Sequence, residues 1–238
     1  MFPLGELRKD EVRAIARKTG LATAEKKDSQ GLCFIGKVRL PDFLQQQLKP
    51  KAGYIIRISP ETAVSLSKVP LELPPASELH NVSGNLLNDI CATPVYKPGD
   101  GSIAGTHRGA HYYTIGQRRG LNVGGTAEPL YVIATDTHRN ILYVGMGEEH
   151  PGLLRKGLFV SKNDIHWIRE DLRLKTGESA EYLVRIRYRQ PLFRASLIMR
   201  TNGLYIVFDE PQKGVAPGQF AAWYKDDECI GSGVIDHH

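Results

Sequence analysis

The sequence is poor in cysteine and has no paired cysteine motif. Its 238 residues include only three cysteines, Cys33, Cys91 and Cys229, which lie far apart. Without a Cys-x-x-Cys pair a structural zinc site is disfavoured, and an odd number of separated cysteines disfavours a disulfide framework. These features indicate a reducing compartment, and we expect a cytoplasmic location.

Long apolar runs are missing too. No segment approaches the roughly 20 apolar residues that span a bilayer. The first residues, MFPLGELRKDEVR, also lack the apolar stretch of a signal peptide. We therefore expect no membrane partner.

The common motifs of nucleotide and metal sites are also absent. The sequence has no glycine-rich P-loop, no Gly-x-Gly-x-x-Gly fingerprint, no His-Glu-x-x-His pair and no Ser-Gly-Gly-x-Asp-Ser pyrophosphate loop. His107 and His111 have the spacing of two metal ligands on a helix, but Gly109 between them disfavours that helix. We expect this chain by itself to hold no cofactor and no metal.

The composition that remains is globular with a mild basic excess. Hydrophobic residues make up 41% of the chain and charged residues 24%, which is enough for a packed core. The formal net charge of +5 permits contact with nucleic acid or another polyanion without requiring it.

The pattern predicts a mainly β protein with a short α segment at the N-terminus. Residues 9–19 carry apolar side chains at helical spacing, with Asp10 as a candidate cap and Gly20 as a stop. Residues 41–48 suit a second short helix. The proline-rich residues 50–100 read as an irregular, extended insertion.

From residue 102 onward, short β-rich runs alternate with glycine and turn residues. We predict strands at 111–117, 129–136, 140–146, 157–161, 179–190, 194–200, 204–211, 219–227 and 229–235, with hairpin turns at residues 138–140 and 226–227. This spacing is typical of a small β-barrel or sandwich. We therefore expect a central β-rich domain, residues 38–155, followed by a small C-terminal β-barrel, residues 156–238.

Cys33 lies in a polar, glycine-containing stretch, KKDSQGLCFIG, residues 26–36. The two preceding lysines favour the thiolate, which is the reactive form of cysteine. The Phe-Ile pair that follows suits a buried and inert thiol instead, since free cysteine is often buried. The residues alone leave both interpretations open, whereas Cys91 and Cys229 read as structural.

Two later stretches are rich in cations. In GTHRGAHYYTIGQRRGL, residues 105–121, arginines and aromatic side chains suit phosphates and bases, although a solvated hairpin is the alternative. Arg118 and Arg119 are candidates there on charge alone.

In VRIRYRQP, residues 184–191, Arg185, Arg187 and Arg189 would share one strand face. Three cations on one face repel each other unless a phosphate backbone or neighbouring acidic side chains compensate their charge. We expect residues 209–219, DEPQKGVAPGQ, to form a loop near that face.

In this order, four stretches together resemble one family, the bacterial tRNA 2-thiouridylases. They are FPLGELRKDEVRAIARKTGL, KKDSQGLCFIG, GTHRGAHYYTIGQRRGL, and VRIRYRQP with DEPQKGVAPGQ. The resemblance covers only the back part of the family's chain, because the adenylating (PP-loop) domain with its pyrophosphate loop and first catalytic cysteine has no counterpart here. It implies that residues 1–37 are the tail of that domain and carry the cysteine loop.

The resemblance implies an ATP-dependent sulfurtransferase that moves persulfide sulfur to C2 of the wobble uridine of tRNA. It implies that Cys33 carries the persulfide and that the family's first cysteine then releases the sulfur by forming a disulfide with it. It also implies tRNA contacts, at Arg187, Tyr188, Arg189 and Gln219. The partners would be tRNA and a sulfur-donor protein, with ATP and magnesium bound by the missing domain, so we expect this chain to be inactive alone.

Two other interpretations stay open from the residues. The chain could be a non-catalytic tRNA-binding module with an inert Cys33. It could also be a β protein whose basic strand meets an acidic surface of a protein partner.

Overall fold

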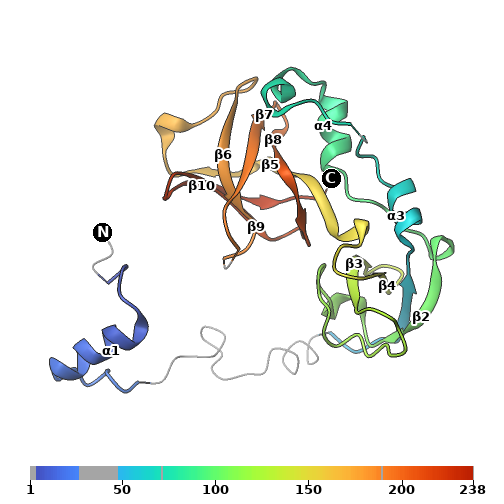
Figure 1. Ribbon diagram of the computed structural model, residues 1–238, viewed down its shortest axis with the longest axis horizontal. Helices are drawn as coiled ribbons and strands as arrows, with labels where there is room; N and C mark the ends of the chain where they lie inside the picture. Colours follow the sequence, from blue (N-terminus) through green and yellow to red (C-terminus); the bar gives the residue numbers. More distant parts are fainter. Residues whose placement is uncertain (1–3, 27–47, 71, 189, 238) are drawn as a thin grey trace. The chain divides into compact units, whose positions relative to one another are not determined.

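The structure, a computed structural model, describes residues 4–26, 48–70, 72–188 and 190–237. Contacts divide the chain into two compact units, residues 1–49 and residues 50–238. The second unit holds a four-stranded sheet and a closed six-stranded barrel (Figure 1). The predicted fold class, mainly β with a short N-terminal helix and a C-terminal barrel, is confirmed.

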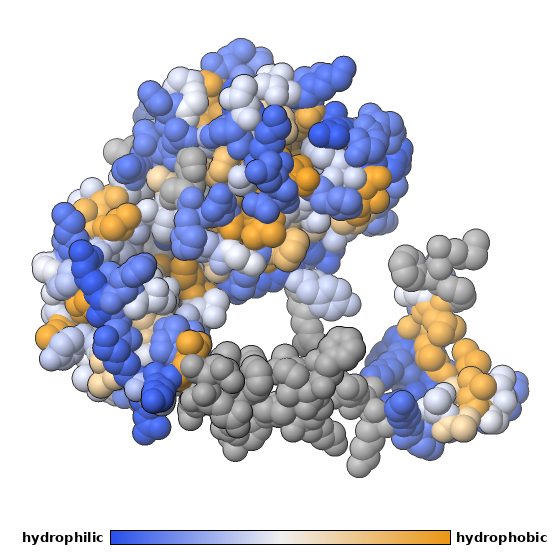
Figure 2. Space-filling model, turned by 180° about the vertical axis from the view of Figure 1, so that it is seen from behind, coloured by the Kyte–Doolittle hydropathy of each residue, from blue (hydrophilic) through white to orange (hydrophobic). Residues whose placement is uncertain are grey.

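Helix α1, Lys9–Lys18, lies in the first unit. The predicted cap at Asp10 is wrong, because Arg8 is the N-cap residue and its backbone N–H donates to the Glu11 carboxylate at 2.6 Å. Gly20 follows the helix at a φ of 69°, the left-handed conformation that ends helices. The unit exposes Leu4, Leu7, Ile15 and Leu21, and Figure 2 shows an apolar patch on it.

Residues 50–100 are more regular than the sequence suggested. They form β1 (Gly53–Arg57), α3 (Pro60–Ser65), the 3-10 turns η1 (Ala76–Asn81) and η2 (Pro98–Asp100), and α4 (Gly84–Cys91). The extended excursion predicted at VPLELPPASEL, residues 69–79, has no helix or strand in the described residues before η1. Two helices on either side of it were missed, and serines cap both: the hydroxyls of Ser59 and Ser83 accept the backbone N–H groups of Thr62 and Leu86. Most of the helix predicted at 41–48 falls outside the described residues.

The central sheet has the strand order β2-β1-β4-β3, with β1 parallel to β4 and the other pairs antiparallel. The remaining strands are β2 (Ser102–His107), β3 (Leu130–Asp136) and β4 (Ile141–Met146). The strands predicted at 129–136 and 140–146 are confirmed. The strand predicted at 111–117 is wrong: the 3-10 turn η3, Ala110–Tyr112, and a loop replace it, because Gly109 and Gly116 bend the backbone at φ values of 144° and 84°.

Asn140, in the turn between β3 and β4, joins three parts of this sheet. Its side-chain Nδ2 donates to the carbonyls of Lys51 (3.0 Å) and Ala52 (2.9 Å), just before β1. Its Oδ1 accepts the backbone N–H of Ala110 at 2.9 Å. Its own carbonyl lies 3.2 Å from Nε2 of His107. One buried side chain at a φ of 57° therefore fixes the entry to β1 and the start of the loop after β2.

Six strands close the barrel in the order β10-β5-β8-β7-β6-β9. They are β5 (Leu154–Trp167), β6 (Ser179–Arg185), β7 (Phe193–Met199), β8 (Gly203–Lys213), β9 (Phe220–Lys225) and β10 (Glu228–Ile235), with the 3-10 turns η4 (Pro151–Leu153) and η5 (Glu170–Leu172) beside β5. Each predicted strand from residue 157 onward falls on one of these. The hairpin turn at 226–227 is confirmed, with Asp226 at a φ of 53°.

Side-chain alternation on β8 serves two cores. Ile206 and Phe208 point into the barrel, where they join a buried cluster that includes Trp167 and Trp223. Tyr205 and Val207 point outward into a second buried cluster with α4. In residues 203–208 both faces of β8 are buried and the sequence is apolar, whereas the end of the strand, DEPQK, is mostly exposed. Helix α4 packs on the outside of the barrel.

Two buried histidines, His107 and His150, make the same pair of contacts. In each ring Nδ1 accepts a backbone N–H, from Gly109 (2.9 Å) or Gly152 (3.1 Å). Nε2 lies 3.2 Å from a backbone carbonyl in each case, so the neutral tautomer with the proton on Nε2 satisfies both nitrogens. Burial lowers the pKa of both histidines below their usual 6.5, although the backbone contacts oppose the effect.

We expect stability to fall as the pH drops below about 6.5. Below this pH both histidines are protonated in the unfolded chain but stay neutral in the folded protein. Protonation therefore favours the unfolded state until the pH falls below the lowered pKa values of the folded protein. The check is the urea midpoint between pH 8 and pH 5. The double variant His107→Gln and His150→Gln should flatten this dependence, whereas His138→Gln, at an exposed histidine, should not; equal slopes in all proteins would contradict the assignment.

Candidate nucleic-acid interface

Two predicted site residues, Cys33 and Arg189, lie outside the described residues and stay predictions. The other two cysteines can be placed. Cys91 is buried, its thiol donates to the carbonyl of Leu158 at 3.3 Å, and burial raises its pKa strongly. A protonated, enclosed thiol is a poor nucleophile. Cys229 is half-buried, with Sγ 3.7 Å from the carbonyl oxygen of Gly231.

The predicted strand face of three arginines is wrong for Arg185 and Arg187. Strand β6 ends at Arg185, and Arg187 lies in the bend that follows. The backbone N–H of Ile186 donates to Oε1 of Gln190 at 3.3 Å instead of to a neighbouring strand. The N–H of Gln190 in turn donates to the carbonyl of Arg187 at 3.1 Å, which closes a turn. Arg187 therefore lies in a turn that follows β6.

The Arg187 guanidinium lies between two loops from distant parts of the sequence. Its Nη2 donates to the carbonyl of Gly214 at 2.9 Å. A Cβ atom at Gly214 would lie 2.7 Å from this nitrogen, and one at Gly116 would lie 3.2 Å from it. Both glycines have positive φ values, 66° and 84°. Only glycine allows this close approach without strain, so the two loops and the turn after β6 meet at one guanidinium.

This meeting point joins three of the stretches singled out in the sequence. The expected loop near the arginines exists for residues 214–219, whereas residues 209–213 belong to β8. The loop that carries Gly116 is tied to β3 by the bond from its N–H to the carbonyl of Val132 at 2.8 Å. Arg118 and Arg119 are exposed on that same loop.

A groove of about 510 Å³ lies beside Arg187 on the outside of the barrel. Its walls come from the end of β6 with the following turn and from β9 with the residue before it: Arg185, Ile186, Arg187, Tyr188, Gln219, Phe220, Ala222 and Tyr224. Three residues predicted to contact tRNA, Arg187, Tyr188 and Gln219, are thus brought together. None of the described residues that line the groove is acidic.

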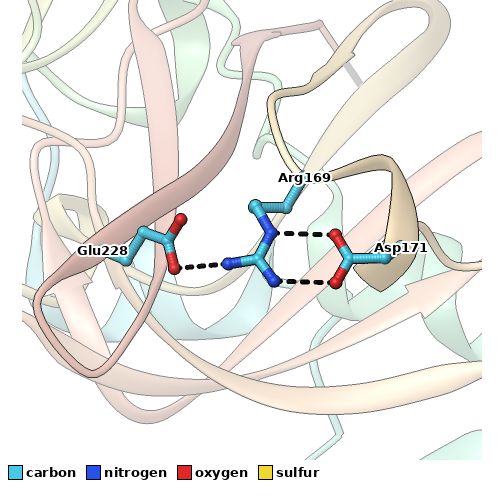
Figure 3. A network of polar contacts seen from close by, with 3 residues as sticks. All are labelled: Arg169, Asp171 and Glu228. Atoms are coloured by element: carbon cyan, nitrogen blue, oxygen red, sulfur yellow. Dashed lines mark hydrogen bonds and ion pairs between the residues drawn. The ribbon is translucent and has the colours of Figure 1, made fainter.

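Other cations of the barrel are neutralised by acids. Arg169 makes a two-bond contact with Asp171, at 2.8 and 2.7 Å, and a third bond with Glu228 at 2.6 Å (Figure 3). These hydrogen bonds, with Asp171 first, raise the pKa of Arg169 further. Lys213 likewise forms an ion pair with Glu149. Ion pairs with carboxylates reduce the net positive charge at these sites and hence their attraction for a phosphate.

The groove arginines differ, because no acidic partner is found for them among the described residues. Nη1 of Arg185 donates to the carbonyl of Tyr188 at 3.1 Å, and its guanidinium lies 4.9 Å from the ring centre of Tyr224. Arg187 donates to a backbone carbonyl, as described above. Neutral partners leave the positive charge of both groups in place.

Two exposed aromatic side chains flank this charge. Tyr188 is 88% exposed and Phe220 is 61% exposed. On β9 the odd residues Ala221 and Trp223 point into the barrel, whereas Phe220, Ala222 and Tyr224 line the groove. Sequence reasoning missed Phe220 and Tyr224 as candidate site residues, although the period of two in FAAWYK contains the signal.

Gln219 is held at the edge of the groove by its backbone. Its N–H donates to the carbonyl of Ala216 (3.2 Å), and its carbonyl accepts the N–H of Ile235 (2.7 Å). The side-chain oxygen Oε1 has no hydrogen-bond partner among the described residues. This oxygen is also enclosed by the protein, so it would meet a ligand only after the side chain turns toward the groove.

The described residues place no group of three or more His, Cys, Asp or Glu side chains around a possible metal position. His107 is engaged with the backbone, and the ring of His111 packs on that of Tyr112 with centroids 4.1 Å apart. Of the helices in the described parts of the chain, none has both the length and the apolar composition needed to cross a membrane.

Three family descriptions match successive parts of the chain. Residues 1–37 match the tRNA methyl transferase HUP domain, residues 91–146 match the tRNA methyl transferase PRC-barrel domain, and residues 156–235 match the aminomethyltransferase beta-barrel domain. The last range covers nearly all of the closed barrel and contains the turn after β6.

Curated relatives match along almost the whole chain. A tRNA-specific 2-thiouridylase of Flavobacterium johnsoniae is 53% identical over 99% of this chain, and one of Christiangramia forsetii is 49% identical over 99%. A third, of Halalkalibacterium halodurans, is 40% identical over 100%. The chain spans 58%, 58% and 52% of the lengths of these relatives. With this identity, and with the three family matches in order along it, the chain belongs to the family of the tRNA-specific 2-thiouridylases.

Proposed function

We propose that this chain is the tRNA-docking and sulfur-accepting part of a tRNA 2-thiouridylase, and that Arg187, Tyr188, Arg189 and Gln219 contact the tRNA. The observation that carries the docking role is the groove, where two arginines without acidic partners lie beside exposed aromatic rings. Phosphate contacts need uncompensated cations, and aromatic faces suit bases. The proposed partners are tRNA and a sulfur-donor protein, in the cytoplasm.

We further propose a three-part division of the chain. Residues 1–37 would be the tail of the adenylating domain, residues 38–155 a central domain and residues 156–238 the barrel. The ranges of the three family matches support this division. The groove then lies on the barrel, and the loop with Gly116 comes from the central domain.

In the proposed chemistry Cys33 accepts sulfur. Its thiolate attacks the terminal sulfur of a donor persulfide, the donor's S–S bond breaks, and the donor leaves as a thiolate while Cys33 becomes a persulfide. The lysines that precede it in the sequence favour the thiolate. Release of the sulfur by disulfide formation needs a second cysteine, and the described cysteines, enclosed Cys91 and half-buried Cys229, do not suit that role. This chain alone should therefore accept sulfur without completing turnover.

The residues of this chain do not fit ATP. The sequence has none of the glycine-rich loops that hold nucleotide phosphates. ATP, with magnesium, would convert the C2 oxygen of the uridine into a leaving group in the whole protein.

The docking proposal is tested by binding of an unmodified tRNA transcript across a salt series. We expect affinity to fall steeply with salt, and Arg187→Ala to weaken binding and to lower the salt slope by about one unit, as loss of one phosphate contact does. Arg169→Ala is the matched control, because Asp171 and Glu228 already neutralise that arginine in the same barrel. It should leave both quantities close to those of the unchanged chain. Fluorescence anisotropy of labelled tRNA gives both.

Each other result selects an alternative. No tRNA binding at low salt would reject the docking role and favour a surface for an acidic protein. Equal losses in the Arg187 and Arg169 variants would move the footprint away from the groove. Normal tRNA binding with no sulfur on Cys33 would make the chain a non-catalytic tRNA-binding module.

A further inference from the structure

We propose that the barrel groove holds one unstacked nucleotide of the RNA, with its base packed against Tyr188 and Phe220. The inference rests on the proposed function and deepens it, because it gives the groove a specific part of the RNA to bind. It also adds Phe220 to the binding residues. A phosphate-only footprint would need the arginines and would make no use of the aromatic rings.

The aromatic rings stand out against the rest of the barrel. Trp167, Phe208 and Trp223 are 6% exposed or less, whereas Tyr188 and Phe220 present most of their surface to solvent. A single exposed apolar residue is ordinary on a protein surface. Here the two rings line one groove together with Arg185 and Arg187. Aromatic faces beside cations are the usual combination at sites for single-stranded nucleic acid.

The backbone that carries both rings is held by hydrogen bonds before any ligand arrives. Phe220 belongs to β9 and pairs with Val234 of β10. Tyr188 lies in the turn closed by Gln190, and its carbonyl accepts a bond from Arg185. Little backbone order remains to be gained on binding, which favours affinity.

The groove distinguishes unpaired from paired RNA. In a duplex both faces of each base are already stacked on neighbouring bases, so an aromatic ring on the protein has no base face to meet. An unpaired base offers its face to the rings and its edge to the polar groups. Gln219 precedes Phe220 in the chain and lines the same groove. Its enclosed Oε1 has no hydrogen-bond partner among the described residues, so a rotation of the side chain would let the amide donate to and accept from such an edge without breaking a bond of Oε1.

In this arrangement the two arginines bind the phosphate of that nucleotide. Arg187 uses Nη2 for the carbonyl of Gly214, and Arg185 uses Nη1 for the carbonyl of Tyr188, which leaves other N–H groups of each guanidinium for a phosphate. The groove thus offers stacking, edge recognition and charge within about 510 Å³. That volume is in the range of sites for small molecules.

The test compares three RNA probes on the full chain: an unmodified tRNA transcript, a short single-stranded oligouridylate and a blunt duplex of equal length. The single strand carries 2-aminopurine at one position, whose fluorescence drops when it stacks. We expect Phe220→Ala and Tyr188→Ala each to weaken single-strand binding about 5- to 100-fold, to abolish the fluorescence drop and to leave the salt slope unchanged. Phe220→Tyr and Tyr188→Phe should restore binding. Ile103→Ala, at a similarly exposed apolar residue of β2, is the control and should change nothing.

The outcomes distinguish failure of base stacking from failure of the tRNA-docking role. If tRNA binds with the expected salt dependence but the Phe220 and Tyr188 variants behave like the unchanged chain, stacking is overturned and the docking role stands. Equal losses for duplex and single strand would also overturn stacking. No binding of any RNA would overturn both. Tighter binding of polyglutamate than of RNA would replace the nucleotide with an acidic protein segment.

Discussion

Replacing Asn140 with alanine should lower the free energy of unfolding by about 4 kcal/mol, a large share of the stability of an ordinary domain. The change leaves two carbonyls before β1 and one N–H at Ala110 without their partner. It also places alanine in the left-handed conformation at a φ of 57°. Urea unfolding followed by far-UV circular dichroism measures the loss.

Two further variants separate these causes. Asn140→Gly removes the same hydrogen bonds but tolerates the positive φ, so it should recover about 1 kcal/mol relative to alanine. Arg139→Ala changes the exposed neighbour in the same turn, which forms a surface ion pair with Asp136, and should have a small effect. If Arg139→Ala destabilises the protein as much as Asn140→Ala, the hydrogen bonds of Asn140 do not hold the sheet together as described.

Replacing Cys33 with serine should abolish sulfur acceptance. A serine hydroxyl is almost fully protonated at neutral pH and cannot take up sulfane sulfur as a stable persulfide. The unchanged chain, treated with glutathione persulfide, alkylated and digested, should show one added sulfur on the peptide that contains Cys33. Peptide mass spectrometry reads out the position.

Cys229→Ser is the control, because it removes the half-buried thiol and should leave the labelling of Cys33 intact. Cys91 should stay unlabelled in the folded chain, since its thiol is enclosed and its pKa is raised by burial. Sulfur found mainly on Cys229, or labelling that persists in Cys33→Ser, would reject the assignment of the acceptor.

The strands were predictable where their signals are local. The runs at 129–136 and 140–146 are rich in β-branched and aromatic residues and flank a polar turn, and the structure forms that hairpin. The capping serines Ser59 and Ser83 were equally local, and reading them would have predicted two helices in residues 50–100. The end of β6 could not be read in this way. The alternation of arginines continues past Arg185, and only a bond from Ile186 to the side chain of Gln190 shows that the ladder has ended.

The residues of the candidate site also differ in whether a local signal in the sequence indicates them. Resemblance to a family supplied Arg187, Tyr188 and Gln219, and the structure brings these three to one groove. Phe220 was within reach of sequence reasoning, because it shares its face with Tyr224 at a period of two. The contact between Arg187 and the two glycines joins residues that are 27 and 71 positions apart, and no local pattern signals such a contact.

The single guanidinium shared by two loops couples events that would otherwise be independent. An anion bound to the remaining N–H groups of Arg187 acts on the same guanidinium that donates to the carbonyl of Gly214 and lies next to Gly116. Thermodynamic linkage makes the effect mutual: whatever occupancy of the groove does to the loop of Arg118 and Arg119, displacement of that loop does in return to the affinity of the groove. The amide hydrogen exchange of this loop should therefore change when a ligand binds in the groove.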